Sequence, residues 1–241
     1  MEKGLLYPVT NKFRQDQKLD GLWDFKFDPS AEGEKKGWTT GLGDPIKMPV
    51  PASFNDFFTD KDSREYTGDF WYAKKFFVPD YMKDKMIELR FGAATHRATV
   101  YVNGQEIRSH EGGFLPFTAD ITTAIKLGEE NIVALKMNNE LHRDALPAGD
   151  TAILKNGKKM SKPFFDFYNY SGLNRSVHLL AIPKENIYDY STTYDVSENQ
   201  ATVHYDVKAT AGSNFMVSLA DEDGQIVATL SLIHLWRCRR I

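Results

Sequence analysis

The chain has 241 residues, a length that fits one large domain or two modest ones. Its 30 basic and 33 acidic residues give a formal net charge of −3, so the chain has no net positive charge that would attract nucleic acid or anionic lipid. The single cysteine, Cys238, excludes an internal disulfide, and no group of His and Cys residues has the spacing of a zinc site.

The first eight residues lack the apolar core of a secretory signal, and no apolar run approaches the ~20 residues that span a bilayer. We therefore expect a soluble, cytoplasmic protein that needs no metal or other cofactor and binds neither membranes nor nucleic acid. Phe, Trp and Tyr make up 13% of the residues, a content that favours β-structure and also suits stacking against sugar rings.

Strands dominate the pattern from the first periodic segment onward. Aromatic and charged residues alternate from Trp23 to Phe27, which predicts a strand with one solvent-exposed face. The Gly-, Glu-, Lys- and Asp-rich segment 31–44 is expected to be a surface loop. Further strands are predicted over residues 70–78, 86–91, 98–107, 131–137 and 175–181.

Within 98–107, the pair Asn103-Gly104 tolerates positive φ and predicts a hairpin with a type I′ turn. One short helix is expected over Thr118–Lys126, and residues 144–162 are expected to form a long mobile loop. Many short strands with almost no helical periodicity predict an all-β sandwich or jelly roll.

A domain boundary is predicted at residues 182–186. After it, short strands are expected over 188–196, 201–209, 215–220 and 225–230, with the spacing of an immunoglobulin-like sandwich. We therefore assign residues 1–183 to a jelly-roll domain and 184–229 to a partial immunoglobulin-like domain. Residues 230–241 carry three arginines within four positions and are interpreted as a non-native tail, with a terminal strand or a basic partner-binding tail as alternatives.

Eight segments, in order and at similar spacing, resemble the N-terminal part of bacterial β-glucuronidases of glycoside hydrolase family 2. They cover nearly all of residues 15–183, and the most specific is Phe165–Val177, with the sequence FDFYNYSGLNRSV. The other seven are Leu19–Phe25, Pro51–Asp56, Tyr66–Tyr72, Arg90–His96, Val102–Glu106, His110–Phe117 and Asn138–Leu141.

The resemblance implies a jelly-roll sugar-binding domain, an incomplete immunoglobulin-like domain, and a catalytic (β/α)₈ barrel that this chain does not reach. It implies a retaining hydrolase of β-D-glucuronides, homo-oligomeric when complete, whose catalytic glutamates lie on the barrel, so that the chain alone is inactive. Two alternatives are a free-standing carbohydrate-binding module and the N-terminal part of another family 2 enzyme, such as a β-galactosidase. The Phe165–Val177 segment disfavours the β-galactosidase, and the half-finished second domain disfavours the module.

Asp166 is the candidate site residue, and Glu140 is a carboxylate in a similar-looking motif. The resemblance places Asp166 where the N-terminal domain reaches the sugar, and an ionised carboxylate accepts hydrogen bonds from hydroxyls. The alternative role for Asp166 is to accept nearby backbone amides or to pair with Arg175. Glu140 follows an asparagine, as the acid/base glutamate of the family does, but it lacks the proline that follows in that motif and is expected to be structural.

Overall fold

The computed structural model describes residues 7–198, 200–210 and 215–232, and in these residues the all-β prediction is confirmed. The strands are β1 (Gln15–Lys18), β2 (Gly21–Asp28), β3 (Ile46–Val50), β4 (Asp69–Val78), β5 (Lys85–Phe91), β6 (Arg97–Val102), β7 (Gln105–Glu111), β8 (Phe117–Asp120), β9 (Glu129–Asn138), β10 (Gly149–Ile153), β11 (Lys159–Pro163), β12 (Val177–Pro183), β13 (Ile187–Ser197), β14 (Gln200–Ala209), β15 (Phe215–Ala220) and β16 (Ile226–Leu232). The helices are short: α1 (Phe54–Phe57), α2 (Lys61–Arg64) and the 3₁₀ turns η1 (Trp38–Thr40) and η2 (Asp80–Met82).

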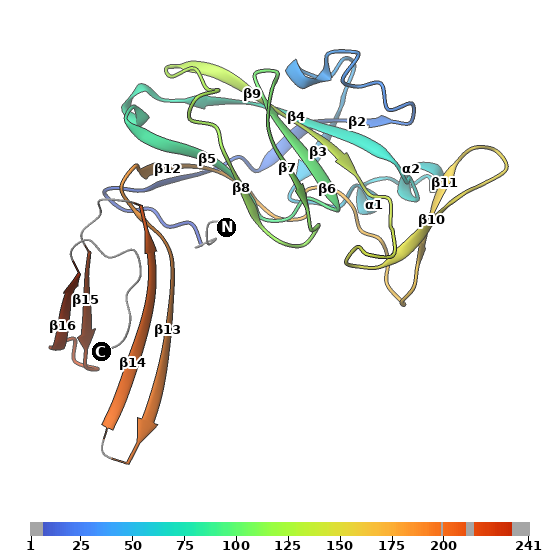
Figure 1. The fold of residues 1–241 in the computed structure, drawn as a ribbon. Coiled ribbons are helices and arrows are strands. Elements are labelled where there is room, and N and C mark those ends of the chain that lie inside the picture. Colours follow the sequence, from blue (N-terminus) through green and yellow to red (C-terminus); the bar gives the residue numbers. More distant parts are fainter. Residues whose placement is uncertain (1–6, 199, 211–214, 233–241) are drawn as a thin grey trace. The chain divides into compact units, whose positions relative to one another are not determined.

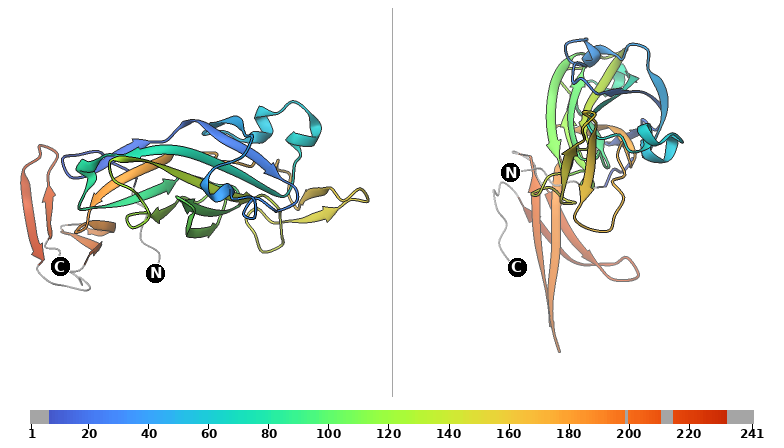
Figure 2. Two further views of the ribbon diagram at one scale, coloured as in Figure 1. Left: turned by 90° about the horizontal axis from the view of Figure 1, so that it is seen from above. Right: turned by 90° about the vertical axis from the view of Figure 1, so that its right-hand side faces the viewer.

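Residues 9–181 form one compact unit built from two main sheets and the two-stranded sheet β10–β11 (Figures 1 and 2). The larger sheet has the strand order β3-β2-β4-β9-β6-β7, and the smaller has the order β1-β12-β5-β8. All pairings in the larger sheet, and the pairings β1–β12 and β5–β8 in the smaller one, are antiparallel, and most neighbours in space are not neighbours in sequence. One face of each sheet is apolar, so the two faces pack against each other as in a β-sandwich.

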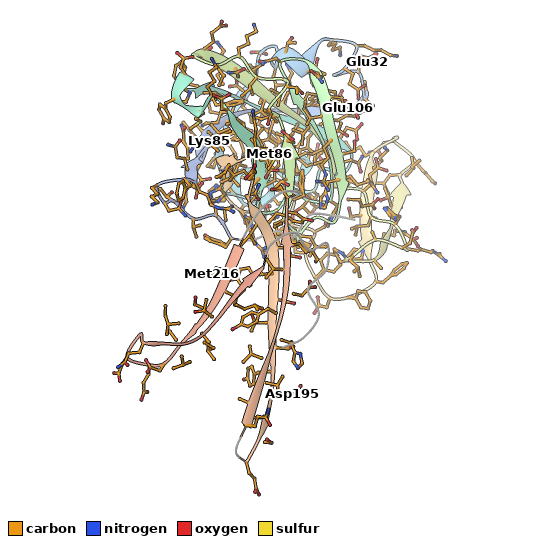
Figure 3. The ribbon with its side chains drawn as sticks, turned by 60° about the vertical axis from the view of Figure 1, so that its left-hand side comes forward. Glu32, Lys85, Met86, Glu106, Asp195 and Met216 are labelled. Atoms are coloured by element: carbon orange, nitrogen blue, oxygen red, sulfur yellow. The ribbon has the colours of Figure 1, made fainter. Side chains whose placement is uncertain are left out.

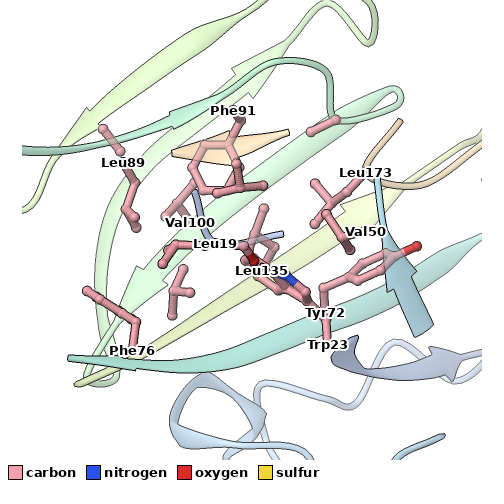
Figure 4. Packing of buried hydrophobic residues seen from close by; sticks show 14 of the residues in the cluster. Leu19, Trp23, Val50, Tyr72, Phe76, Leu89, Phe91, Val100, Leu135 and Leu173 are labelled. Carbon is pink, nitrogen blue, oxygen red and sulfur yellow. Dashed lines mark hydrogen bonds between the residues drawn. The ribbon is translucent and has the colours of Figure 1, made fainter. Parts of the chain in front are cut away.

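The core lies between these two sheets, as Figure 4 shows. Trp23, Tyr72 and Leu135 come from the larger sheet, and Leu89 and Phe91 come from the smaller one. All five are fully buried, and burying each such side chain contributes roughly 1.5–3 kcal/mol. The alternation predicted for residues 23–27 is therefore a consequence of one face of β2 packing into this core.

The hairpin predicted over residues 98–107 is confirmed as β6 and β7. Asn103 and Gly104 both have positive φ, 51° and 86°, as a type I′ turn requires. Strand β7 then continues to Glu111 in register with the start of β6.

The helix predicted over Thr118–Lys126 is wrong. Residues 117–120 form strand β8, in which Phe117 and Ala119 are buried and pair with Phe91 and Leu89 of β5. Only one helical turn follows, closed by the bond from the Ile125 amide to the Ile121 carbonyl. Pairing with β5 and burial of two side chains outweigh the weak local helix preference.

The long loop expected at 144–162 is also a correction, because its two halves pair as the hairpin β10–β11. Its turn is closed by the Leu154 amide, which donates to the Lys158 carbonyl at 2.8 Å. Polar residues and four lysines hid the alternation, since β11 is largely exposed and β10 is mostly only half-buried.

Residues 31–44 form a surface loop, as predicted, and most of them are exposed, but Trp38 and Leu42 are buried. The loop contains η1 and folds over the outer face of the larger sheet, where Trp38 and Leu42 are buried against Trp71. The rings of Trp38 and Trp71 meet edge to face at 6.1 Å. This segment builds a second, smaller apolar cluster on the side of the sheet away from the main core.

The other compact unit contains the described residues from 182 onward, together with Tyr7 and Pro8. The four strands expected after the boundary are present as two separate hairpins, β13–β14 and β15–β16. Apolar side chains such as Tyr194 and Met216 stay exposed, and Figure 3 shows Asp195 near the tip of the first hairpin. Of the predicted tail, residues 230–232 belong to β16, and residues 233–241, with Cys238, lie outside the described residues.

Candidate functional site

Asp166 lies on an arch of residues 164–167, directly after β11, and its side chain is exposed. It makes no hydrogen bond or ion pair with any residue that the structure describes. Arg175 instead donates from its NH1 group to the Phe114 carbonyl at 3.2 Å. The structure therefore contains neither of the two structural roles considered for Asp166, and its carboxylate is available to a ligand.

Hydrogen bonds to distant segments hold the chain that follows the arch in place, and most of them involve Ser171. The Ser171 side chain and backbone are buried, and its amide donates to Asn55 Oδ1 at 2.7 Å. Its carbonyl accepts from the Phe54 amide at 3.0 Å, and Asn139 Nδ2 donates to its hydroxyl at 3.0 Å. Segments more than 30 or 100 residues away in sequence thus fix this point of the chain.

Gly172 lets the chain approach this close to its neighbours. Its φ is 128°, a value that L side chains rarely adopt, and its carbonyl accepts from the Thr95 amide at 3.1 Å. A Cβ at this position would lie 2.8 Å from the Tyr72 hydroxyl and 3.0 Å from the Ala52 carbonyl oxygen. Both the backbone conformation and the lack of space therefore require glycine here.

Asn169 connects the arch to His96, and its orientation is fixed by its own bonds. Asn169 Nδ2 donates to the Asn139 carbonyl at 3.0 Å and to Ser161 Oγ at 3.1 Å. Its Oδ1 must therefore accept from His96 Nε2, which makes His96 the neutral tautomer with its proton on Nε2. Burial lowers the pKa of His96 and so favours its neutral form.

His96 Nδ1 is buried and has no hydrogen-bond partner among the described residues. A buried acceptor without a partner costs free energy, so this ring keeps its position because the surrounding packing holds it. The Phe114 ring meets the His96 ring edge to face at 5.8 Å.

Aromatic residues at positions 165, 167, 168 and 170 flank Asp166 in the sequence. Phe165 is 66% exposed, and the rings of Tyr168 and Tyr170 lie 4.8 Å apart, tilted, with more than a third of each residue exposed. The Tyr168 hydroxyl donates to the Arg64 carbonyl at 3.2 Å, which fixes one ring. Exposed aromatic residues and an exposed carboxylate on one short segment are residue types that suit a ring with apolar C–H faces and hydroxyl edges.

A cleft of about 230 Å³ opens behind the arch. Its lining combines apolar side chains of the arch and β11 with buried amides. The lining includes Asn55, Tyr66, Met160, Phe167, Tyr168 and Asn169. The cleft therefore has walls from the arch, β11 and the segment around α1 and α2.

Glu140 is part of a different arrangement. Its Oε1 pairs with Lys159 and accepts from Asn138 Nδ2 at 3.2 Å, and the same amide group donates to Asp69. Burial raises the pKa of Glu140, but the bonds from Lys159 and Asn138 outweigh it and hold the pKa below its ordinary value. A general acid needs the opposite shift, so Glu140 is not suited to protonate a leaving group.

From the sequence, Asp166 is predicted as a site residue, which stays a prediction, whereas the residues that hold the following segment were missed, chiefly Ser53, Asn55, Asn139 and Ser171. The described ranges contain no group of three or more His, Cys, Asp and Glu residues that would hold a metal ion. In the same ranges, no helix has both the length and the apolar character that crossing a membrane requires.

Comparison with known proteins gives one consistent result. Residues 17–183 match the family described as glycosyl hydrolases family 2, sugar binding domain. β-Glucuronidase from Paenibacillus borealis is 39% identical over 232 residues, which cover 93% of this chain and 39% of the relative. The Homo sapiens β-glucuronidase is 34% identical over 250 residues, which cover 95% of this chain and 38% of the relative.

Solved structures agree with this result. Lactobacillus rhamnosus β-glucuronidase matches with a TM-score of 0.91 and 66% identity, covering 95% of this chain and 39% of that one. The Ruminococcus gnavus enzyme in complex with D-glucuronic acid matches with a TM-score of 0.92 and 51% identity, covering 97% and 41%. This chain therefore spans about two fifths of the length of the proteins it matches.

Proposed function

Because this chain belongs to glycoside hydrolase family 2, we propose that it is the N-terminal part of a β-glucuronidase in which Asp166 contacts the sugar. The support for the activity is the match to β-glucuronidases over nearly the whole chain, in sequence and in structure. The observation that carries the role of Asp166 is its exposed carboxylate, which has no partner among the described residues and sits beside a firmly held segment.

Catalysis itself needs residues outside this chain. A retaining glycosidase uses two carboxyl groups about 5–5.5 Å apart, one of them with a raised pKa. Glu140 is paired with a lysine and has a lowered pKa, so it does not fill the acid/base role. On this proposal the chain supplies substrate binding, and a further part of the complete, homo-oligomeric enzyme supplies the two glutamates.

The chemistry of Asp166 follows from its charge. A carboxylate accepts hydrogen bonds from two sugar hydroxyls at once, and a bond to a charged acceptor contributes roughly 1.5–3 kcal/mol. The neighbouring Phe165 and Tyr170 would cover the contact when the sugar is bound and so strengthen it, because screening by water falls.

The test is Asp166→Asn in the complete enzyme that carries this chain at its N-terminus. We expect kcat/KM for an aryl β-D-glucuronide to fall about ten- to hundred-fold, with the melting temperature unchanged. Asp223→Asn, at an exposed turn between β15 and β16, is the matched control and should change neither quantity. A kcat/KM within twofold of the unaltered enzyme, at unchanged melting temperature, would show that Asp166 does not touch the substrate.

A further inference from the structure

The outer face of the larger sheet carries a groove of about 470 Å³ over β9, β6 and β7. The strand register places polar side chains there in rows that run across the three strands. One row is Asn138, Arg97 and Glu111, and the next is Lys136, Thr99 and Ser109. Adjacent positions in a row are about 4.8 Å apart across the sheet, which is close to the scale of one sugar ring.

Loop 31–44 contributes Glu34 to the groove lining, and Asp28 fixes the start of that loop. The buried Asp28 carboxylate accepts from the amides of Glu32 and Gly33, both at 2.9 Å, and from Trp71 Nε1 at 3.0 Å. A Cβ on Gly33 would lie 2.4 Å from Trp71 Nε1, so only glycine permits this approach. The conformation at the start of the loop is therefore set by the fold before any ligand arrives.

The fixed loop presents Glu34 to the groove. Glu34 Oε1 accepts from Lys136 Nζ at 2.7 Å, and this bond raises the pKa of Lys136. Two of the three lysine N–H groups remain for a ligand. Figure 3 labels Glu32, at the start of the loop, and Glu106, on β7 in the groove lining.

Several groups in the groove have unused hydrogen-bonding capacity. Arg97 bonds Asn138 and the Glu140 carbonyl through NH2, whereas its NH1 lies 3.8 Å from Glu111, beyond hydrogen-bonding distance. Thr99 and Ser109 share one hydroxyl bond of 3.0 Å and each retain further capacity. The Glu106 carboxylate makes no hydrogen bond with the described residues.

The charges decide which ligand fits. Two cations, Arg97 and Lys136, face three carboxylates, Glu34, Glu106 and Glu111, so the groove has no excess positive charge to bind phosphate or an acidic polymer. It offers donors and acceptors side by side, and a sugar hydroxyl is both donor and acceptor. We propose that this groove is a second carbohydrate site, for neutral oligosaccharides, separate from the Asp166 arch.

The test uses the 241-residue chain itself and three neutral probes: cellopentaose, xylopentaose and maltopentaose. Titration followed by amide chemical shifts should give saturable changes with at least one probe, in the millimolar range and concentrated on β6, β7 and β9. The variant Thr99→Val with Ser109→Ala keeps side-chain volume but removes both hydroxyls, and should bind about tenfold more weakly. Lys75→Met, on the exposed outer side of β4, is the control and should bind as the unaltered chain does.

Asp166→Asn separates this inference from the proposed function and should leave binding of the neutral probe unchanged. The proposed carbohydrate site is refuted if no probe binds at 20 mM. It is also refuted if the double variant binds as tightly as the unaltered chain and keeps the same melting temperature. It is also refuted if Asp166→Asn abolishes binding, because the probe would then occupy the arch.

Discussion

Gly172 offers the sharpest test of how the candidate site is built. In Gly172→Ala, the backbone must keep a φ of 128° that costs about 1–3 kcal/mol for an L residue. The new Cβ also lies 2.8 Å from the Tyr72 hydroxyl and 3.0 Å from the Ala52 carbonyl oxygen. Neither atom can move away easily, because the Tyr72 side chain is fully buried and the Ala52 oxygen belongs to the backbone. Overpacking of this kind adds about 1–3 kcal/mol.

Taking about 3 kcal/mol for the sum, we expect the melting temperature of the sandwich unit to fall by about 6–12 °C, since 1 kcal/mol corresponds to about 2–4 °C at this size. Gly157→Ala is the matched control, because Gly157 also has positive φ, 80°, but its Cβ would meet nothing within 4 Å. It should cost only about 1 kcal/mol. Equal losses for the two variants, measured by thermal and urea unfolding, would refute the packing argument for Gly172.

Three further predictions follow from individual groups. Burial lowers the pKa of His96 in the folded state, so the full contribution of its neutral form to stability is present above pH ~6.5. As the pH falls below that value, the free energy of unfolding decreases by up to about 1.4 kcal/mol per pH unit. Urea unfolding at pH 7.5 and 5.5 should therefore show a smaller pH dependence for His96→Gln than for the unaltered chain, and an equal pH dependence would contradict this. Asp28→Asn should lower the free energy of unfolding in urea by about 1.5–3 kcal/mol, because an amide has one acceptor oxygen for the three donors that bond Asp28. The same variant should make Trp38 more accessible to a fluorescence quencher. No change in either quantity would show that Asp28 does not hold its loop in place. Amides of β13–β16 should exchange much faster than those of β4 and β9, because each hairpin leaves apolar side chains exposed; equal protection would show that the second unit is as stable as the sandwich.

The sequence predicted those elements whose pattern is local. Alternation over residues 23–27 and the Asn103-Gly104 turn each report a structure that their own residues determine, and both are confirmed. Residues 118–126 were assigned wrongly because strand β8 depends on its pairing with β5, which lies earlier in the chain. Residues 144–162 were assigned wrongly because the β10–β11 hairpin is rich in polar residues and lysines, which hide the strand alternation. Trp38 was placed on a surface loop because nothing nearby in sequence shows that Trp71 lies beneath it.

The same reasoning explains which parts of the candidate site could be anticipated. Asp166 stands in a segment specific enough to resemble a family, so one residue could be singled out. The bonds that hold its neighbour Ser171 join positions 32 to 118 residues apart, and no periodicity reports them. Ser and Asn residues at strand ends, such as Asn139 after β9, were the available signal, because short polar side chains there often bond backbone groups of other segments.

The end of β9 connects the two candidate sites. Asn138 faces the outer side of the sheet, where Arg97 donates to its Oδ1, whereas Asn139 turns toward the arch and donates to Ser171 Oγ. Asn139 also accepts from the Gly68 amide at 2.9 Å, which ties the same residue to the start of β4. Because successive residues at a strand end point to opposite sides, two adjacent asparagines can position two separate surfaces. The sandwich therefore works as a rigid support for both, and a change at Asn139 should affect the arch while leaving the groove intact.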